Sequence, residues 1–561
     1  MSDSARAVVA AIAEHWAVPG GAVLAVDRHG EVFSHRFGHA DVAASIAVAP
    51  QHRFEIGSIS KVFTSIAVLQ LVGAGLLRLD EPIGAVLDWL PTSLRGDGIT
   101  VGRLLNHTAG LVASVDAVPD EIAQVTTFAG DVSAAPPGTF FHYSNLGFVV
   151  LGLAVRHVAG RPLVDLVRTD ILAPLEMTST IACVTHDDYG SLARGYQPPR
   201  DDQPWVPRDA VVAAPWLEVA GADGNIAATV SDLGRFARML LGRGTLDGTT
   251  ILSAADFDTM VKSVAPDGED VLALAGVPAT ESSRYGLGIN VERTGGHTVL
   301  SHGGGMVGYA SFLLADLDDG IAVCVVTNAN GDTPVAEAMA RSVAAELTAP
   351  GTVKLDALDP HLWDARLVEN LNCTGEFVDA TTGSASSGGP SEIEVRADRR
   401  GDDLVALSVQ CDGQRAPLLR TWSGAAVTPM RSLRRFAFTF DDGAWLWGPR
   451  MFTRADAPSP AAPTADPPAS GLGPFCGHYR AYSPWFTNFR VVLRRGRLLL
   501  IAPGGVEAPA DEAELVALSG STFRIGADPR LPERITFGTP VGAVAPWADR
   551  DGCRYSRAFT D

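Results

Sequence analysis

Residues 1–350 alternate between segments with a strand pattern and segments with a helix pattern. The apolar runs at 20–30 (GGAVLAVDRHG) and 31–41 (EVFSHRFGHAD) meet around His29-Gly30 and predict a β-hairpin. Residues 62–77 (VFTSIAVLQLVGAGLL) are apolar on nearly every face, so they predict a buried helix.

The second half of this region repeats the alternation. Ser231-Asp232 precedes LGRFARMLL and predicts a capped helix, and residues 320–330 (GIAVCVVTNAN) predict a continuous strand. Residues 334–348 (PVAEAMARSVAAELT) have the period of an amphipathic helix. Together these elements predict an α+β fold: an antiparallel sheet flanked by terminal helices, with an inserted helical region.

After residue 350 the helical patterns give way to short alternating β-runs. Gly375-Glu376-Phe377 and Gly477-His478-Tyr479 resemble each other at an offset of 102 residues, and residues 452–455 resemble 555–558 at an offset of 103. These echoes predict a duplicated unit folded as two small antiparallel β-barrels. The Pro/Ala-rich stretch ADAPSPAAPTADPPASG separates the copies as a linker. The expected domains are 1–350, 361–455 and 472–561.

Composition narrows the class of protein. The chain is 46% apolar and 19% charged, which is typical of a globular protein with a core. Its net charge of -20 argues against nucleic acid and anionic membranes as partners. No apolar run approaches ~18 residues, and the N-terminal MSDSARAVVAAIAEHW lacks the pattern of a secretory signal, so we expect a cytoplasmic protein outside the membrane. The six cysteines are far apart, and no residues have metal-ligand spacing, so neither a metal nor a cofactor is expected.

Ser58 and Lys61 form the first candidate for chemistry, in the segment FEIGSISKVF. The chain has three lysines against 41 arginines, and one of them lies a helical turn after this serine. If a helix begins near Ser58, its peptide dipoles and the Lys61 ammonium both favour negative charge on the serine oxygen. A serine hydroxyl needs such activation to act as a nucleophile.

Two further segments carry polar groups suited to the same chemistry. FHYSNLGF supplies Tyr143, a candidate general base if an ammonium lies near it, and Asn145, a candidate hydrogen-bond partner for a substrate amide. SHGGGMVGYASFLL supplies His302 and the glycines Gly304 and Gly305. Glycines entering a strand-like run predict a β-edge whose N–H groups can complete an oxyanion hole with that of Ser58.

The three segments, in this order, resemble the three signatures of the penicillin-recognising serine hydrolases. That superfamily includes class C β-lactamases, DD-peptidases, D-aminopeptidases and esterases. The segments LLNHTAGL (104–111) and GADGNIAATVSDLGRFARML (221–240) are also similar to it, so the resemblance covers residues 1 to about 348. It implies a β-lactamase-like fold for this part of the chain.

The resemblance also implies roles for the candidate residues. Ser58 would attack a carbonyl and form an acyl-enzyme, while Lys61 and Tyr143 would move the proton, with the immediate base left open. The amides of Ser58 and Gly305 would hold the oxyanion, and Asn145, His302 and Gly304 would lie at the substrate.

His302 stands where most β-lactamases and carboxypeptidases have lysine. A histidine is only partly charged at neutral pH, which argues against substrates with a free carboxylate. Together with two following barrels, this histidine resembles the D-aminopeptidase branch. By that analogy residues 502–514 (APGGVEAPADEAE) are a candidate loop reaching the site, and Asp223 is one candidate acceptor for a substrate ammonium.

We therefore expect a serine hydrolase that cleaves small amides, short peptides or esters, with D-aminopeptidase activity favoured. A carboxylesterase or an acyltransferase (peptide cyclase) with the same machinery is the alternative, and an inert ligand-binding protein is a third hypothesis. The sequence leaves the natural substrate and the oligomeric state open, with a homodimer as one option.

Overall fold

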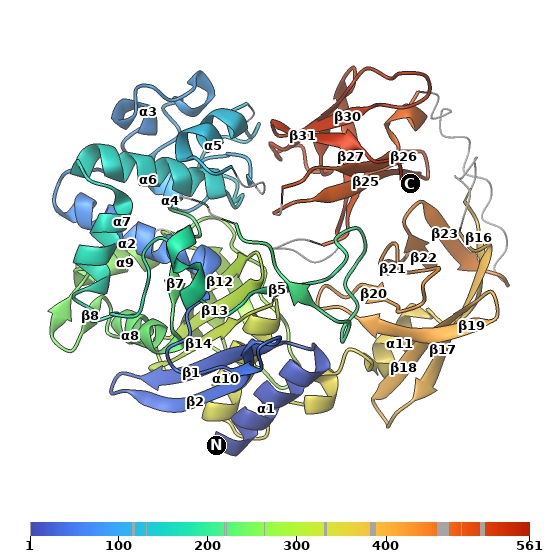
Figure 1. Cartoon of the computed structure of the whole chain (residues 1–561), viewed down its shortest axis with the longest axis horizontal. Helices are drawn as coiled ribbons and strands as arrows, with labels where there is room; N and C mark the ends of the chain where they lie inside the picture. Colours follow the sequence, from blue (N-terminus) through green and yellow to red (C-terminus); the bar gives the residue numbers. More distant parts are fainter. Residues whose placement is uncertain are drawn as a thin grey trace.

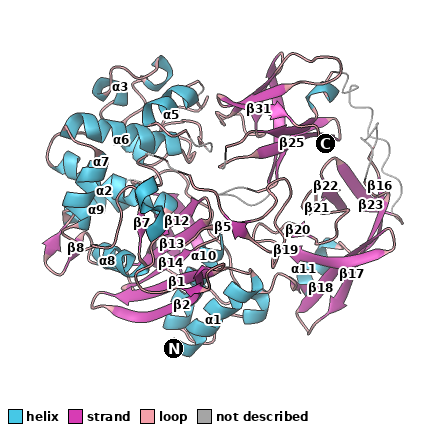
Figure 2. Ribbon diagram, viewed as in Figure 1, coloured by secondary structure: helices cyan, strands magenta, loops and turns pink. Residues whose placement is uncertain are grey.

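A computed structural model of the chain describes residues 2–114, 118–130, 132–217, 219, 221–262, 264–329, 334–381, 389–456, 471–483, 485–504 and 511–560. Figure 1 shows an N-terminal region of sheet and helices beside two β-barrels. Figure 2 shows that the helices gather in the N-terminal region, whereas the barrels consist almost entirely of strands. The α+β architecture expected from the sequence is confirmed.

The N-terminal region (residues 2–348) is built on one antiparallel sheet of eight strands. The predicted hairpin around His29-Gly30 is present as β1 and β2. In spatial order the strands are β10 (Thr280–Tyr285), β11 (Asn290–Thr294), β12 (His297–Met306), β13 (Tyr309–Asp316), β14 (Ile321–Thr327), β1 (Gly20–Asp27), β2 (Glu31–Asp41) and β3 (Ile46–Ala47).

Alternate residues of the central strands feed two cores, one on each face of the sheet. On β1, Val23 packs with the terminal helices α1 (Ser2–His15) and α10 (Pro334–Thr348). Leu24 points the other way, into the larger core beneath α8 (Val230–Leu241). Successive strand side chains point to opposite faces, so both faces of this sheet are covered.

The larger core is completed by the inserted helical region. Its main helix, α2, is buried on nearly all faces, as predicted from its apolar sequence. Helix α2 spans Ser60–Gly73. The other α-helices of the region are α3 (Ile83–Val86), α4 (Val101–Leu105), α5 (Glu121–Phe128), α6 (Asn145–Ala159), α7 (Leu163–Leu166) and α9 (Ala254–Lys262). The 3₁₀ turns are η1 (Gly57–Ile59), η2 (Thr92–Leu94) and η4 (His186–Ser191), and η3 (Val167–Leu172) is a π-helix. Short strand pairs link them: β4 (Phe54–Glu55) with β7 (Ala227–Ala228), β5 (Tyr196–Gln197) with β6 (Val212–Ala213), and β8 (Thr245–Leu246) with β9 (Thr249–Thr250).

The predicted cap of α8 is wrong in position. Thr229 is the N-cap residue, and its side chain accepts a hydrogen bond from the Asp232 backbone N–H. Ser231 lies inside the first turn. The Asp232 carboxylate instead accepts hydrogen bonds from Ser179 N–H and the Thr180 hydroxyl, so it ties the helix start to a neighbouring loop.

The middle barrel follows α10 through the 3₁₀ turn η5 (Leu355–Leu358) and the short helix α11 (Ala365–Leu371). Eight of its strands form a closed ring in which β18 pairs with β19 and the first ring strand, β16, pairs with the last, β23; β15 pairs with β18 at the edge. The strands are β15 (Trp363–Asp364), β16 (Gly375–Asp379), β17 (Glu392–Arg399), β18 (Leu404–Cys411), β19 (Gln414–Arg420), β20 (Ala426–Val427), β21 (Phe438–Asp441), β22 (Ala444–Trp447) and β23 (Arg450–Arg454).

The terminal barrel is a closed ring of eight strands preceded by the 3₁₀ turn η6 (Gly473–Phe475). The strands are β24 (Gly477–Arg480), β25 (Asn488–Arg494), β26 (Arg497–Ala502), β27 (Asp511–Ser519), β28 (Thr522–Ile525), β29 (Arg534–Phe537), β30 (Trp547–Arg550) and β31 (Cys553–Arg557). Most of the predicted linker, and residues 505–510 of the predicted loop at 502–514, lie outside the described residues.

The sequence echoes occupy corresponding strands of the two barrels. β16 pairs with β23 in one barrel, and β24 pairs with β31 in the other. Each echo begins with a glycine under an arginine: a Cβ at Gly375 would lie 3.3 Å from the Arg454 guanidinium, and one at Gly477 would lie 2.4 Å from that of Arg557. Gly375 also has a φ of +126°, a backbone conformation that favours glycine. The repeat therefore marks the closure of each barrel.

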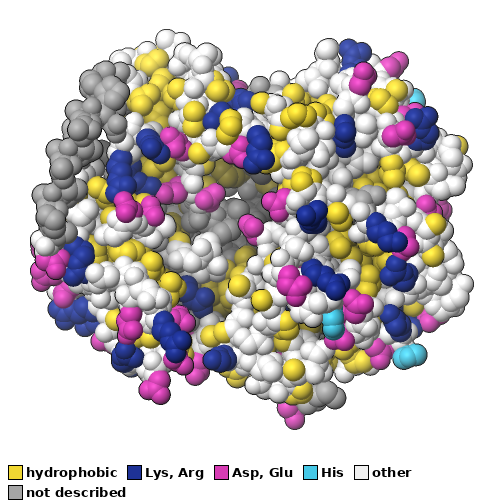
Figure 3. Space-filling model, turned by 180° about the vertical axis from the view of Figure 1, so that it is seen from behind, with side chains coloured by type: hydrophobic (Ala, Val, Ile, Leu, Met, Phe, Trp, Pro, Cys, Tyr) yellow, Lys and Arg dark blue, Asp and Glu magenta, His cyan; other side chains and the backbone are white. Residues whose placement is uncertain are grey.

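Two further features concern the charged surface and the length of the apolar helices. On the face seen in Figure 3, basic and acidic side chains are interspersed rather than separated into patches of one sign. Among the described helices, no single one is long and apolar enough to cross a bilayer, although α6 and Leu163–Leu172 pass that test together as a pair bent by 76°.

Candidate active site

Ser58 lies in the 3₁₀ turn η1, which leads from β4 into α2. The turn can form because Gly57 adopts a φ of +50° and lacks a side chain: a Cβ there would lie 2.6 Å from the Gly305 N. Left-handed backbone at such a close approach favours glycine. The predicted position of Ser58 in the first turn of a helix is confirmed, and the same glycine brings Ser58 next to β12.

Lys61 is fully buried and its ammonium contacts Ser58 directly. The Nζ lies 2.8 Å from the Ser58 Oγ and donates a second hydrogen bond of 2.8 Å to the Asp223 carbonyl. The rings of Tyr143 and Phe148 lie 5.0 and 5.7 Å from the Nζ. A buried ammonium is costly unless it is paired, so these four contacts account for a lysine in an apolar helix.

Tyr143 and Asn145 come to the site at the start of α6. Ser144 is the N-cap residue: its hydroxyl donates to the Val112 carbonyl and accepts from the Gly147 N–H. The cap holds Tyr143 against Lys61 and buries Asn145, whose Nδ2 donates to the Ser114 carbonyl over 3.3 Å. Among the described residues, none hydrogen-bonds to the Asn145 Oδ1, which is left as a buried acceptor.

His302 lies on β12, with its ring centroid 6.5 Å from that of Tyr143. Its Nδ1 lies 2.6 Å from the Gly303 carbonyl, so Nδ1 carries the proton, and the Nε2 accepts from the Tyr285 hydroxyl over 2.7 Å. Burial lowers the pKa of His302 to about 3, with a further contribution from Lys61. The expectation of a partly charged ring at neutral pH is therefore wrong: the imidazole is neutral.

Gly304 and Gly305 place the edge of β12 against η1, the turn that carries Ser58 (the nucleophile turn). The pairing of β12 with β11 ends at Ser301, so this part of β12 has no strand on that side. A Cβ at Gly304 would lie 1.9 Å from the Ile56 carbonyl oxygen, which accepts a hydrogen bond from Ser311. The predicted meeting of the glycine-rich edge with the Ser58 turn is present.

Two aromatic side chains join the site without having been predicted. The His107 ring lies 4.3 Å from the Tyr143 ring and 4.6 Å from the Tyr285 ring, and its Nδ1 accepts from the Ser144 N–H. Burial, with the charge of Lys61, lowers the pKa of His107 well below its usual value. His107 belongs to the segment LLNHTAGL, whose family likeness was the available signal; Tyr285 has no local motif.

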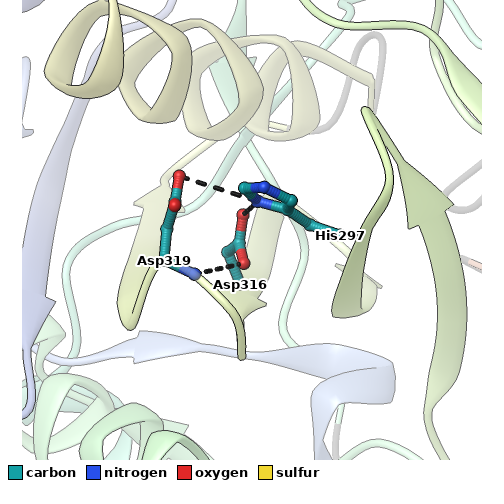
Figure 4. A group of neighbouring side chains, drawn as sticks. All are labelled: His297, Asp316 and Asp319. Atoms are coloured by element: carbon teal, nitrogen blue, oxygen red, sulfur yellow. Dashed lines mark hydrogen bonds and ion pairs between the residues drawn. The ribbon is translucent and has the colours of Figure 1, made fainter.

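A separate group of titratable side chains lies at the far end of β12. His297 Nδ1 lies 2.9 Å from Asp316 and 3.7 Å from Asp319 (Figure 4). The Asp316 carboxylate also accepts from the Asp319 backbone N–H across the β13–β14 turn. The hydrogen bond that His297 donates to the Asp316 carboxylate raises the pKa of His297, so these residues form an ion-paired turn.

Comparison with known proteins agrees with this geometry. The family model described as "Beta-lactamase" matches residues 8–348. A penicillin-binding protein 4 from Amycolatopsis lactamdurans is 32% identical over 265 residues, which span 44% of this chain and 66% of that protein. This chain thus covers just under two thirds of that relative's length.

Two solved structures are similar in fold. The octameric penicillin-binding protein homologue from Pyrococcus abyssi has a TM-score of 0.57 at 21% identity and covers 80% of this chain and 99% of that one. The D-amino acid amidase from Ochrobactrum anthropi SV3 complexed with D-phenylalanine has a TM-score of 0.51 at 25% identity and covers 62% and 99%. Because the family model spans more than half of the chain, the protein belongs to the beta-lactamase family of serine hydrolases.

Proposed function

We propose that the protein cleaves small amides through an acyl-enzyme at Ser58, with substrates that carry a free amino group favoured. The observation that carries the proposal is the 2.8 Å hydrogen bond between the buried Lys61 Nζ and the Ser58 Oγ. A serine becomes a nucleophile when an adjacent base can take its proton. Lys61 and Tyr143 are the two candidates for that base.

In the first step, the Ser58 Oγ bonds to the substrate carbonyl carbon and its proton passes to Lys61 or Tyr143. The proton then goes to the leaving amine as the amide bond breaks. In the second step, water attacks the acyl carbonyl and gives a proton to the same base. The base passes this proton to the Ser58 Oγ as the ester bond breaks, and the acid is released. Each half-reaction passes through an oxyanion, and in this proposal the backbone N–H groups of Ser58 and Gly305 stabilise it. The close approach of Gly57 to the Gly305 N supports that assignment.

The substrate class follows from charge and from hydrogen bonding. A neutral His302 offers no fixed cation for a substrate carboxylate, which disfavours acids as substrates. The Asn145 Oδ1 is a buried acceptor that a substrate amide N–H can satisfy. The D-amino acid amidase similarity supports amides of amino acids, with D stereochemistry as the preferred form.

A substrate panel tests the proposal. We expect turnover of D-aminoacyl p-nitroanilides, with weaker turnover of the L forms. A serine-directed phosphonate should label Ser58, as mapped by mass spectrometry. Turnover of p-nitrophenyl esters without any anilide would instead identify an esterase, and a folded protein without an adduct at Ser58 would contradict both.

A further inference from the structure

A small pocket lies beside the nucleophile turn and contains a carboxyl group that the mechanism does not use. It encloses about 300 Å³ of empty space, part of it open to solvent. Glu55 supplies the only carboxyl among the described lining residues. The other walls come from η4, from the loop before β7 and from the end of β12: Tyr189, Gly195, Ala214, Pro215, Trp216, Leu217, Met306, Val307 and Tyr309.

Glu55 is 5% exposed, and within the described part of the chain no donor hydrogen-bonds to its carboxyl. Burial raises the pKa of Glu55 to about 8, and no neighbouring cation opposes this. Near pH 7 the pocket therefore holds a protonated carboxyl. Buried polar groups of this kind nearly always have a hydrogen-bond partner. Glu55 therefore has the properties of a carboxyl that hydrogen-bonds to a donor group of a ligand.

Three of the residues that line the pocket with Glu55 are aromatic. The rings of Tyr189 and Trp216 pack edge to face with centroids 5.0 Å apart. Tyr309 completes the wall, and its hydroxyl is already used in a hydrogen bond to the Ala193 carbonyl. A bound ammonium favours loss of the Glu55 proton to solvent, and the resulting carboxylate and the ring faces then attract the cation together.

The pocket adjoins the reacting groups. Glu55 precedes Ser58 by three residues, so their Cα atoms are at most about 10 Å apart. Met306 directly follows Gly305, and a Cβ at Gly224 would contact both the Met306 sulfur at 3.6 Å and the Gly57 carbonyl carbon at 3.9 Å. The wall of the pocket at Met306 therefore lies one residue from Gly305 and close to the turn that carries Ser58.

We propose that the pocket of Glu55, Tyr189, Trp216 and Tyr309 binds a primary ammonium group on the acyl part of the substrate. The proposal rests on the proposed function and identifies which carboxyl selects amino-acyl substrates. An ammonium donates to Glu55 and lies against the rings. An acidic substituent would face the carboxyl without a partner, and a purely apolar one would leave the carboxyl unpaired.

Matched substrates test the proposal. D-Alanyl p-nitroanilide is compared with propionyl p-nitroanilide, and 4-aminobutyryl with butyryl p-nitroanilide, so the two pairs separate an α-amino from an ω-amino group. The wild type should favour one amino member by roughly 10- to 100-fold in kcat/KM, mainly through KM. Glu55→Gln, which keeps the shape and removes the charge, should reduce that ratio to near one. The exposed Glu369→Gln is the matched control and should keep the wild-type ratio.

Calorimetry supplies an arm that does not depend on turnover. Ethylammonium chloride should bind the wild type and not Glu55→Gln, and ethanol should bind neither. An unchanged amino preference in Glu55→Gln, or its loss in Asp223→Asn alone, would overturn the proposal, as would a wild type with no preference and no ethylammonium binding. If the proposed chemistry fails, no acyl substrate turns over and Ser58 takes no phosphonate, whereas ethylammonium binding still decides the pocket.

Discussion

The middle barrel docks where the chain begins, whereas the terminal barrel docks beside the segment that carries Tyr143. Trp422 of the middle barrel stacks on Trp16 with centroids 4.6 Å apart, and Arg434 pairs with Asp209. In the terminal barrel, Glu533 accepts hydrogen bonds from the Ala113 N–H over 2.9 Å and pairs with His142 Nε2 at 2.7 Å. Both barrels also contact the loop between β5 and β6, where Asp201 pairs with Arg480 of the terminal barrel and Asp209 pairs with Arg434 of the middle barrel (Figure 1).

This difference in docking suggests different roles: the middle barrel stabilises the fold, whereas the terminal barrel helps to position residues of the site. Each barrel closes in the same way, with a glycine under an arginine, so the shared fold does not decide the role. The roles differ because Glu533 of the terminal barrel contacts two residues that adjoin the site. His142 immediately precedes Tyr143, and Ala113 immediately precedes Ser114, whose carbonyl accepts a hydrogen bond from Asn145. Arg530 adds a contact by lying 4.2 Å from the Phe140 ring centroid. We expect the terminal barrel, and not the middle one, to influence catalysis.

The largest expected effect sets the baseline for this comparison. Ser58→Ala and Lys61→Ala should each lower kcat by several powers of ten, because each removes part of one proton-transfer unit. The double variant should be barely slower than either single variant. Steady-state kinetics, with thermal unfolding to show a retained fold, measures both effects. A clearly additive double variant would contradict a shared role.

Removing the Glu533 carboxyl comes next. Glu533→Ala should lower kcat/KM up to about a hundredfold, because small displacements of reacting groups have large kinetic costs. It should also lower the free energy of unfolding by about 1–3 kcal/mol, since two hydrogen bonds are lost. Glu533→Gln retains an acceptor and should rescue most of the activity. Equal activity of all three proteins would show that the barrel only adds stability.

Acid should weaken the terminal interface selectively. Burial opposes ionisation of Glu533, but the hydrogen bond and charge of His142 and the Ala113 N–H outweigh it and hold its pKa below the usual 4.5. A lowered pKa gives stability that is present above about pH 4.5 and is lost as pH falls through the folded-state pKa. The stability difference between wild type and Glu533→Gln should therefore shrink as the pH falls below about 4.5. Urea unfolding at each pH measures it, and a difference independent of pH would exclude the linkage.

The smallest effect is expected at the other interface. Asp209→Ala removes the partner of Arg434, a partly exposed pair, and should change stability by about 0–1 kcal/mol. Because Asp209 contacts no described element of the site, kcat/KM should equal that of the wild type. A loss comparable with that of Glu533→Ala would remove the distinction between the barrels.

Short sequence patterns predicted the features that depend on residues close together in the chain. The Ser58–Lys61 spacing, the hairpin around His29-Gly30 and the buried helix α2 depend on neighbours in sequence, so their signals are strong. The contact between Glu533 and His142 joins residues 391 apart, and no periodicity reports it. The loop expected to reach the site, residues 502–514, is partly outside the described residues, and the contact that the structure describes comes from residue 533 instead.

Burial was the other quantity that spacing did not provide. The pKa of His302 and the unpaired carboxyl of Glu55 both follow from exclusion of water by chain segments that meet only in the fold. The cap of α8 lies at Thr229 rather than Ser231 because the helix begins directly after β7, at Val230.

The scarcity of lysine has a practical consequence. Lys262 and Lys354 are exposed, whereas Lys61 is sealed beneath the nucleophile. An amine-reactive dye or resin should therefore couple to these two surface positions while turnover continues, which gives a route to immobilise or label working enzyme. Peptide mapping after brief acylation also tests whether Lys61 stays buried, because modification of Lys61 would show that solvent had reached the interior.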